Sequence, residues 1–295
     1  MQARKSPSKT QHKSQSKSHS QKALRIFFRN KAAVLGMILL LLVILASFVG
    51  RFFTRSIPLK SSAPFTPPGS HEKVMLGTDQ VGRDILAGIL YGGKTTLLVG
   101  ISAATITIII GVVVGALAGF YGGWVDEILM RITEFFQVLP TLLFAMVLVA
   151  LFSPSLWTVI FAIGAVSWTS TARLARAEFL KIKHMEYVTA GRALGMQDSG
   201  LIWKAILPNA LPPLIVSATL IIGVAILFEA GLSFLGLSDP NVISWGAILG
   251  GGRPYFLDAW WIVTLPGLMI FITVLSISLI GDGLNDAFNP KLRES

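Results

Sequence analysis

The stretch "TLLVGISAATITIIIGVVVGALAGF", residues 96–120, decides the fold class. It contains no ionisable side chain, and about 20 such residues in a helix cross a bilayer core of roughly 30 Å. Gly111, Gly115 and Gly119 recur at every fourth position, a spacing that lets two helix backbones approach closely. Glycine is also common in membrane helices generally, so no single pair of these residues decides the packing. The stretch predicts a membrane span that packs into a bundle.

Directly before this span, residues 88–95 read "GILYGGKT" and match the nucleotide-binding pattern G-x-x-x-x-G-K-[ST]. A working P-loop joins a buried strand to a helix in a soluble α/β domain. Here the next segment is the span itself, and no strand–helix alternation precedes it. We therefore interpret the match as accidental. We expect an amphipathic helix that begins at Asp84 and lies in the membrane interface, with Lys94 reaching the lipid headgroups.

Composition extends this interpretation to the whole chain. Of 295 residues, 53% are hydrophobic and 14% charged, against about 25% charged in a soluble domain. The sequence therefore predicts an all-α membrane protein with about six transmembrane helices. The predicted spans are residues 32–52, 96–120, 132–152, 156–174, 211–237 and 260–280.

The remaining composition excludes several kinds of site. The absence of cysteine rules out disulfides, thiolate metal sites and thiol nucleophiles. The four histidines are scattered, and no nucleophile–base pair or carboxylate pair occurs at useful spacing, so we expect no catalysis, cofactor or metal. The net charge of +10 does not indicate nucleic acid, because nine of the 25 Lys and Arg residues lie in residues 1–31, which hold no acid. Such a basic tail is typical of a topology signal in a membrane protein.

Charge also predicts the orientation and the domain organisation. With both termini inside, 18 of the 25 basic residues are on the inner side. The first apolar run exceeds the 7–15 residues of a cleavable signal peptide, so we expect an uncleaved anchor. The predicted units are a disordered basic tail (1–31), a first transmembrane helix (32–52), an extracytoplasmic loop with an interfacial helix (53–95), a core transmembrane domain (96–284) with a polar cytoplasmic loop (175–210), and a cytoplasmic tail (285–295).

The polar segment between the fourth and fifth spans predicts a cytoplasmic helix–turn–helix. The first helix ends at Gly195, and the second begins with Asp198 or Ser199 as N-cap and stops by Pro208. An apolar face could fill the groove of a partner. The alternative is an interfacial helix pair without a partner. The residues expected on that face are Ile202, Trp203, Ile206 and Leu207.

This segment resembles the EAA loop of ABC importer permeases, E-A-A-x3-G-x9-I-x-L-P. The matching positions are Ala190, Gly195, Leu207 and Pro208. Thr189, Gly191 and Ala205 stand where the pattern has Glu, Ala and Ile, so the polar contact to the ATPase implied by that Glu does not carry over to this chain, whereas the docking mode does. The flanking motifs resemble those of the C-type permease subunits of dipeptide and oligopeptide importers, from about residue 24 to the end. They are "LGTDQVGRD", "GFYGGWVDEILMR", "EAGLSFLGL", "WGAIL", "WWIVTLPG" and "GDGLNDAFNPKL".

The resemblance implies a type I ABC importer permease in a bacterial inner membrane. Its implied partners are a homologous B-type permease, two cytoplasmic ATP-binding subunits and an extracytoplasmic solute-binding protein. The substrate could equally be nickel or a metal chelate, glutathione or another small solute. The ATPase-coupling residues that it implies are Glu186, Ala190, Gly191, Gly195, Asp198, Ile206, Leu207 and Pro208.

Glu229 is the only ionisable residue deep in the predicted fifth span. An acid within a membrane is costly and usually faces a partner or an aqueous path. It could line the translocation route, or it could accept hydrogen bonds that hold helices together, which we favour. A secondary transporter would need coupling-ion carboxylates near mid-membrane and often inverted repeats. The sequence offers one such acid and no convincing repeat.

Overall fold

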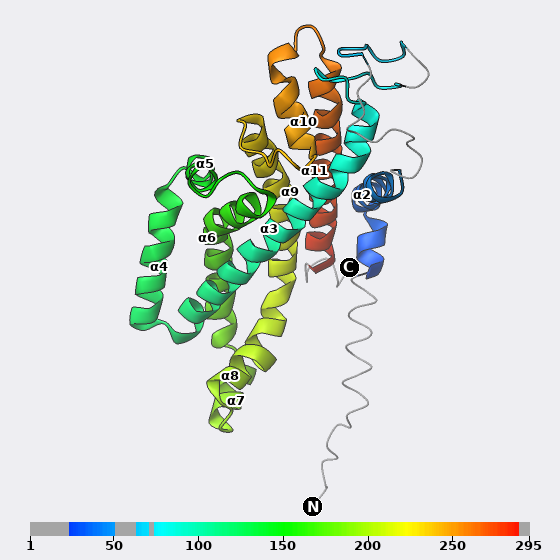
Figure 1. Ribbon diagram of the computed structural model, residues 1–295. Coiled ribbons are helices and arrows are strands. Elements are labelled where there is room, and N and C mark those ends of the chain that lie inside the picture. Colours follow the sequence, from blue (N-terminus) through cyan, green and yellow to red (C-terminus); the bar gives the residue numbers. More distant parts are fainter. Residues whose placement is uncertain (1–23, 51–62, 71–73, 289–295) are drawn as a thin grey trace, which may run out of the picture.

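The computed structural model describes residues 24–50, 63–70 and 74–288 of the chain (Figure 1). Within these ranges the secondary structure is helical, apart from an isolated bridge between Thr78 and Asp84. Among the described helices, five are long and apolar enough to cross a membrane, or six if one bent pair is counted as a span. The predicted all-α fold with about six membrane helices is confirmed.

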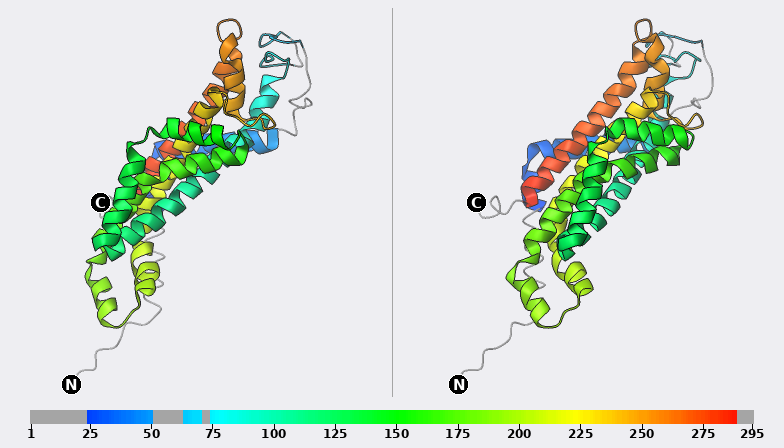
Figure 2. Two further views of the ribbon diagram at one scale, coloured as in Figure 1. Left: turned by 60° about the vertical axis from the view of Figure 1, so that its left-hand side comes forward. Right: turned by 90° about the vertical axis from the view of Figure 1, so that its left-hand side faces the viewer.

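The helices follow the predicted order with different boundaries. The long helices are α2 (Lys31–Val49), α3 (Ile85–Tyr121), α6 (Leu156–Lys183), α9 (Leu207–Phe234) and α11 (Trp261–Phe288), and the bent pair is α4 (Gly123–Val138) with α5 (Thr141–Leu151). Two short helices, α7 (Glu186–Ala193) and α8 (Asp198–Gly200), lie at one end of the molecule. A third, α10 (Trp245–Gly252), lies at the opposite end in all three views (Figures 1 and 2).

The predicted third span, residues 132–152, is not one straight helix. Helices α4 and α5 meet at an angle of 87°. Between them lies Leu139, which is extended with φ −69° and ψ 131° because it precedes Pro140. A proline has no N–H to donate and pushes the residue before it out of the helical region. The sequence did not reveal this break in the helix, because apolar residues continue on both sides of the proline.

The prediction of a separate interfacial helix before the second span is also wrong. Residues 85–95 are the first turns of α3, which runs without a break for 37 residues. Asp84 caps it as predicted, because its side chain accepts a hydrogen bond from the Leu86 N–H. Ile85 and Ile89 pack against Ile262 of α11 instead of facing lipid. The amphipathic pattern therefore reflected contact with another helix. Lys94 is exposed, and its contact with lipid headgroups stays a prediction.

The glycine repeat of α3 forms its contact with α6. A Cβ added at Gly111 would lie 2.5 Å from Thr171 Cβ, and one at Gly119 would lie 2.7 Å from Phe179 Cβ. Real Cβ atoms do not approach other heavy atoms so closely, so glycine is required for the two backbones to pack at this distance. The close helix packing suggested by the spacing is present.

The first and last helices are joined near the chain ends. Asn30 caps α2, and its Nδ2 donates to Asp286 Oδ2 of α11 at 2.9 Å. Residues 24–29 are helical and Phe27 packs against Ala287, although they belong to the tail predicted to be disordered. Residues 1–23 of that tail and residues 289–295 of the predicted C-terminal tail lie outside the described residues.

Candidate functional site at the two ends of the molecule

Residues 184–204, which we call the knob, project from one end of the helical bundle (Figures 1 and 2). Helix α7 ends in the turn predicted at Gly195, where φ is +81°. The Gly195 N–H donates to the Arg192 carbonyl and the Met196 N–H to the Gly191 carbonyl, both at 3.0 Å. This is a Schellman motif, which favours glycine because the left-handed region strains residues that carry a Cβ. A Cβ at Gly195 would otherwise meet open space.

The second helix of the knob differs from the prediction at both of its ends. Its N-cap position is Gln197, so Asp198 is the first helical residue and not the cap. The helix does not stop by Pro208: Asp198 to Phe234 forms one 37-residue helix that includes α8, a π-helical segment (Leu201–Ile206) and α9. The missing N–H of Pro208 costs little here, because the proline lies at the start of α9, directly after the wider π-helical turn.

The apolar face predicted for a partner is largely used within the chain. Ile206 is fully buried in a cluster with Phe179, Val188 and Leu201, and Ile202 and Leu207 pack against that cluster. This cluster fixes the knob to the bundle. Of the four residues predicted for this face, only Trp203 is largely exposed, at 68%.

The exposed apolar surface of the knob is built from other residues. Leu194, immediately before the turn glycine, is 88% exposed, and Met196 is 43% exposed. A shallow groove of about 390 Å³ passes between the turn and Trp203. It is lined by Met196, Gln197, Ser199, Gly200, Trp203 and Lys204. Sequence reasoning missed Leu194, although an apolar residue beside a turn glycine in a polar segment was a signal that could have identified it.

Apart from the turn residue Gly195, the predicted coupling residues lie in three places. Glu186 and Ala190 are exposed on α7, and Asp198 lies 3.8 Å from Arg192 across the turn. Ile206, Leu207 and Pro208 lie at the root of the knob, where its second helix enters α9. Gly191 faces inward: a Cβ there would lie 3.2 Å from Leu201 Cδ2. An alanine at this position would therefore need Leu201 to shift by a few tenths of an ångström.

One cationic side chain of the knob and one from the end of α6 lie over the same aromatic ring of α3. The Arg192 guanidinium lies 5.7 Å from the centre of the Phe120 ring, and the Lys183 ammonium lies 6.0 Å from it. Both distances are within the range of a cation–π interaction. Arg176 on the neighbouring α6 binds Asp126 of α4 with two hydrogen bonds, of 2.5 and 2.6 Å. The knob therefore rests on a framework of α3, α4 and α6.

At the opposite end, Glu229 joins α9 to α10. Its Oε1 accepts hydrogen bonds from Ser233 Oγ at 2.9 Å and from Ser244 Oγ at 2.6 Å. Ser244 is the N-cap of α10, and a Cβ at Gly246 would lie 3.1 Å from Oε1. The carboxylate is 4% exposed, and its Oε2 has no partner among the described residues. These contacts match the helix-holding role that we favoured from the sequence.

Helix α10 is fixed to α3 as well. Trp245 is fully buried, its backbone N–H donates to Thr96 Oγ1, and its Nε1 donates to the Ile89 carbonyl at 2.8 Å. In the preceding loop, Asp239 Oδ2 accepts the Leu156 N–H at the start of α6. The segment from 238 to 252 therefore ties together α3, α6 and α9.

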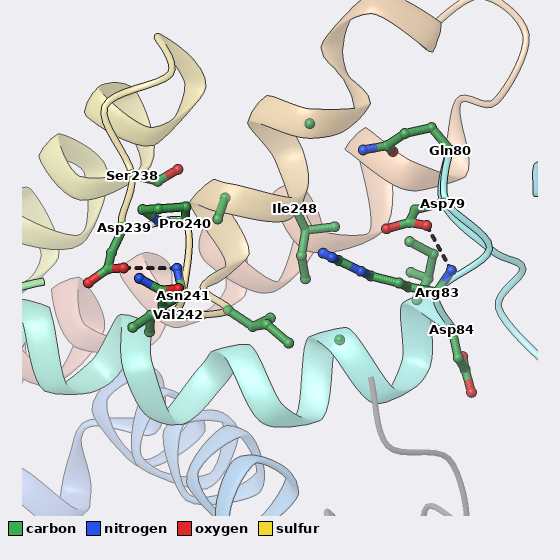
Figure 3. Close-up of a pocket in the computed structure, with 15 residues that line it drawn as sticks. Asp79, Gln80, Arg83, Asp84, Ser238, Asp239, Pro240, Asn241, Val242 and Ile248 are labelled. Carbon is green, nitrogen blue, oxygen red and sulfur yellow. Dashed lines mark hydrogen bonds between the residues drawn. The ribbon is translucent and has the colours of Figure 1, made fainter. Parts of the chain in front are cut away.

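A cavity of about 460 Å³ opens beside this segment, between the first turns of α3, the loop 238–243 and α10 (Figure 3). Acidic, amide and apolar side chains line it, together with the single guanidinium of Arg83. The lining residues are Asp79, Gln80, Arg83, Asp84, Ile85, Gly88, Ser238, Asp239, Pro240, Asn241, Val242, Ile243, Ala247, Ile248 and Gly251. Burial raises the pKa of Asp84, while N–H groups of Leu86 and Ala87 oppose this rise. Within the described ranges, no cluster of three or more His, Asp or Glu side chains could hold a metal ion.

Comparisons with known proteins agree on the family. Residues 111–294 match the model of the "Binding-protein-dependent transport system inner membrane component", and residues 18–68 match the "N-terminal TM domain of oligopeptide transport permease C". The di/tripeptide transport system permease protein DppC of Pseudomonas aeruginosa is 39% identical over 91% of both chains. The dipeptide permease DppC of Bacillus subtilis is 38% identical over 94% of this chain and 87% of its own.

A solved structure shows the same fold. An inward-facing methionine ABC transporter, MetNI, contains a chain that superposes with a TM-score of 0.57 at 20% identity. The match covers 68% of the present chain and 97% of the MetNI chain. The predicted type I importer permease architecture is thereby confirmed at the level of the fold.

Proposed function

The chain belongs to the binding-protein-dependent transport system inner membrane components, and we propose that it is the permease subunit of an ATP-driven importer of dipeptides and oligopeptides. The permease role follows from the family. The peptide substrate is supported by the names of relatives about 38% identical over most of their length. Importers of nickel or metal chelates, glutathione or another small solute would use the same architecture and remain the alternative.

In this proposal the chain forms half of a pore whose other half is a homologous B-type permease. Two ATP-binding subunits on the inner side supply the energy, so this chain needs no catalytic site of its own. The positive-inside distribution of Lys and Arg supports an orientation with both termini and the knob on that side. A solute-binding protein would deliver the substrate at the α10 end.

One observation carries the coupling role. The knob exposes large apolar side chains, which are usually buried at the surface of a protein that faces water. Leu194 and Trp203 are 88% and 68% exposed, and they flank a turn fixed by Gly195. A convex helical surface with apolar anchors fits the groove of a partner protein. The continuous helix from Asp198 to Phe234 would carry a displacement of the knob into the membrane.

Gly195→Asp tests this role against a matched control. The strain of a side chain at φ +81° and the added charge should abolish peptide uptake, while the protein still inserts into the membrane. Gly236 has φ +87° and equally open surroundings at the other end of the molecule. Gly236→Asp therefore reproduces the strain without touching the knob and should retain uptake.

Uptake of a radiolabelled dipeptide and ATP hydrolysis should both be measured on the assembled complex in vesicles. Normal uptake by Gly195→Asp would contradict the coupling role. Uptake that continues with ATP after the ion gradients are collapsed would exclude a secondary transporter, whereas uptake that stops would contradict ATP-driven import.

A further inference from the structure

The loop that leads into α3, residues 76–84, uses nearly all of its polar groups to hold its own shape. Thr78 Oγ1 donates to the Ala63 carbonyl at 2.7 Å and accepts the Thr66 N–H at 2.8 Å. Asp79 Oδ1 accepts the N–H groups of Val81 and Arg83, at 2.9 and 2.7 Å. These bonds explain why this loop needs a threonine and an aspartate, and Asp84 is explained by its cap of α3.

The side chain of Arg83 is the exception. Its guanidinium makes no hydrogen bond or ion pair with any residue that the structure describes. It extends into the 460 Å³ cavity, toward the loop that carries Pro240 and Asn241 (Figure 3). Arg83 is exposed, and its free guanidinium in a concave site presents a fork of N–H donors that matches a carboxylate.

The cavity wall adds further recognition groups. Asn241 offers a side-chain amide, and Gln80 has a buried Oε1 without a partner among the described residues. Val242, Ile243 and Ile248 supply an apolar surface. A volume of about 460 Å³ is typical of a small-ligand site, and the wall combines apolar side chains with polar groups that can orient a ligand.

The charges of the lining select among carboxylates. Three aspartates and one arginine give the wall a formal charge of −2, which disfavours a simple anion. A ligand that carries an ammonium group as well as a carboxylate avoids this repulsion. Asp239 holds its loop through two backbone N–H bonds, so Arg83 is left to face the ligand.

We propose that this cavity binds a short zwitterionic peptide, with its terminal carboxylate on the Arg83 guanidinium. The site rests on the proposed peptide import and would hold the substrate at the α10 end of the permease. An acidic side chain of a docked binding protein presents the same chemical group. We favour the free peptide because the guanidinium lies inside a concave, partly apolar cavity of ligand size.

The test uses the whole complex, isolated in detergent through a tag on this chain and without any binding protein. Equilibrium dialysis measures the binding of radiolabelled Ala-Ala and of its C-terminal amide, which lacks the carboxylate. We expect the amide to bind at least about tenfold more weakly than Ala-Ala, as for a charge-assisted pair. Arg83→Gln should weaken Ala-Ala binding by the same factor and should not weaken binding of the amide, which has no carboxylate for the guanidinium to hold.

Arg253→Gln is the matched control. Arg253 lies just after α10 at the same end of the molecule, outside the cavity lining, with its guanidinium 5.2 Å from the centre of the Phe234 ring. This variant should bind Ala-Ala as the unaltered complex does.

Several outcomes would overturn the site. They are equal binding of Ala-Ala and its amide, no binding of either, or an Arg83→Gln complex that binds Ala-Ala normally and loses only its stimulation by a binding protein. Uptake of Ala-Ala by the unaltered complex with its binding protein separates this failure from that of the proposed function. If uptake proceeds while binding fails the test, only the cavity assignment is wrong; if no peptide is taken up, the proposed function is wrong.

Discussion

Helices α7 and α9 end in the same way at opposite ends of the molecule, yet the chain that follows behaves differently. Gly195 and Gly236 both have a left-handed φ, and each donates its N–H to the carbonyl three residues earlier. After Gly195 the chain forms a knob with Leu194 and Trp203 exposed. After Gly236 it folds back, and Trp245 becomes fully buried.

The difference comes from the contacts that each segment makes with the helical bundle. At the α10 end, Glu229 and Thr96 accept hydrogen bonds from Ser244 and Trp245, and glycines let α10 lie against α9. At the knob, each helix packs against the buried cluster on one side only. The same turn motif therefore gives a self-contained structure at one end and an incomplete one at the other.

The largest difference in stability is expected between substitutions of the two tryptophans, one at each end of the molecule. Trp245→Ala removes a fully buried ring and its hydrogen bond to Ile89, and should lower the free energy of unfolding by about 3–5 kcal/mol. Trp203→Ala should change it by less than about 0.5 kcal/mol, because that ring is mostly exposed. Denaturant unfolding of the detergent-solubilised chain measures both.

Although Trp203→Ala should hardly change stability, it should lower the ATPase activity of the assembled complex. In the assembled complex, Trp203→Ala should reduce binding-protein-stimulated ATP hydrolysis about tenfold if the ring is an anchor in the ATPase groove. Equal stability losses for the two variants, or full ATPase stimulation in Trp203→Ala, would remove the contrast between the ends.

A smaller effect is expected at Glu229. Glu229→Ala leaves the Ser233 and Ser244 hydroxyls without their acceptor in a buried site and should cost about 1–3 kcal/mol of stability. Glu229→Gln keeps a carbonyl oxygen for both donors, so it should cost less and retain substrate uptake. Lost uptake in a well-folded Glu229→Gln complex would instead assign the charge to the translocation path.

The smallest effect is expected at Asp198. Its ion pair with Arg192 is long, at 3.8 Å, and both side chains are 55% exposed. Asp198→Asn should therefore change stability by less than about 1 kcal/mol. Unfolding measured at low and high salt checks this, because the effect should shrink with added salt. A loss that is large and independent of salt would mean that the turn depends on this pair.

The fold was predictable where one local cause dominated. The apolar run of α3, the turn at Gly195 and the cap at Asp84 all follow from hydropathy or backbone chemistry. The bend at Pro140 was missed because apolar residues continue on both sides, and the passage through Pro208 was missed because a π-helical turn relieves the proline. The burial of Ile206 was missed because it depends on packing with Phe179 and Val188, and neither helix periodicity nor a turn signal reveals contacts between separate helices.

The unbroken helix from Asp198 to Phe234 has a mechanical consequence. At about 1.5 Å per residue it is roughly 55 Å long, so a tilt of about 5° around one end moves the other by about 5 Å. Glu229 lies in the penultimate turn of this helix, and its hydrogen bond to Ser244 connects that end of the helix to α10. A displacement of the knob would therefore reach α10 through one helix and the Glu229–Ser244 hydrogen bond.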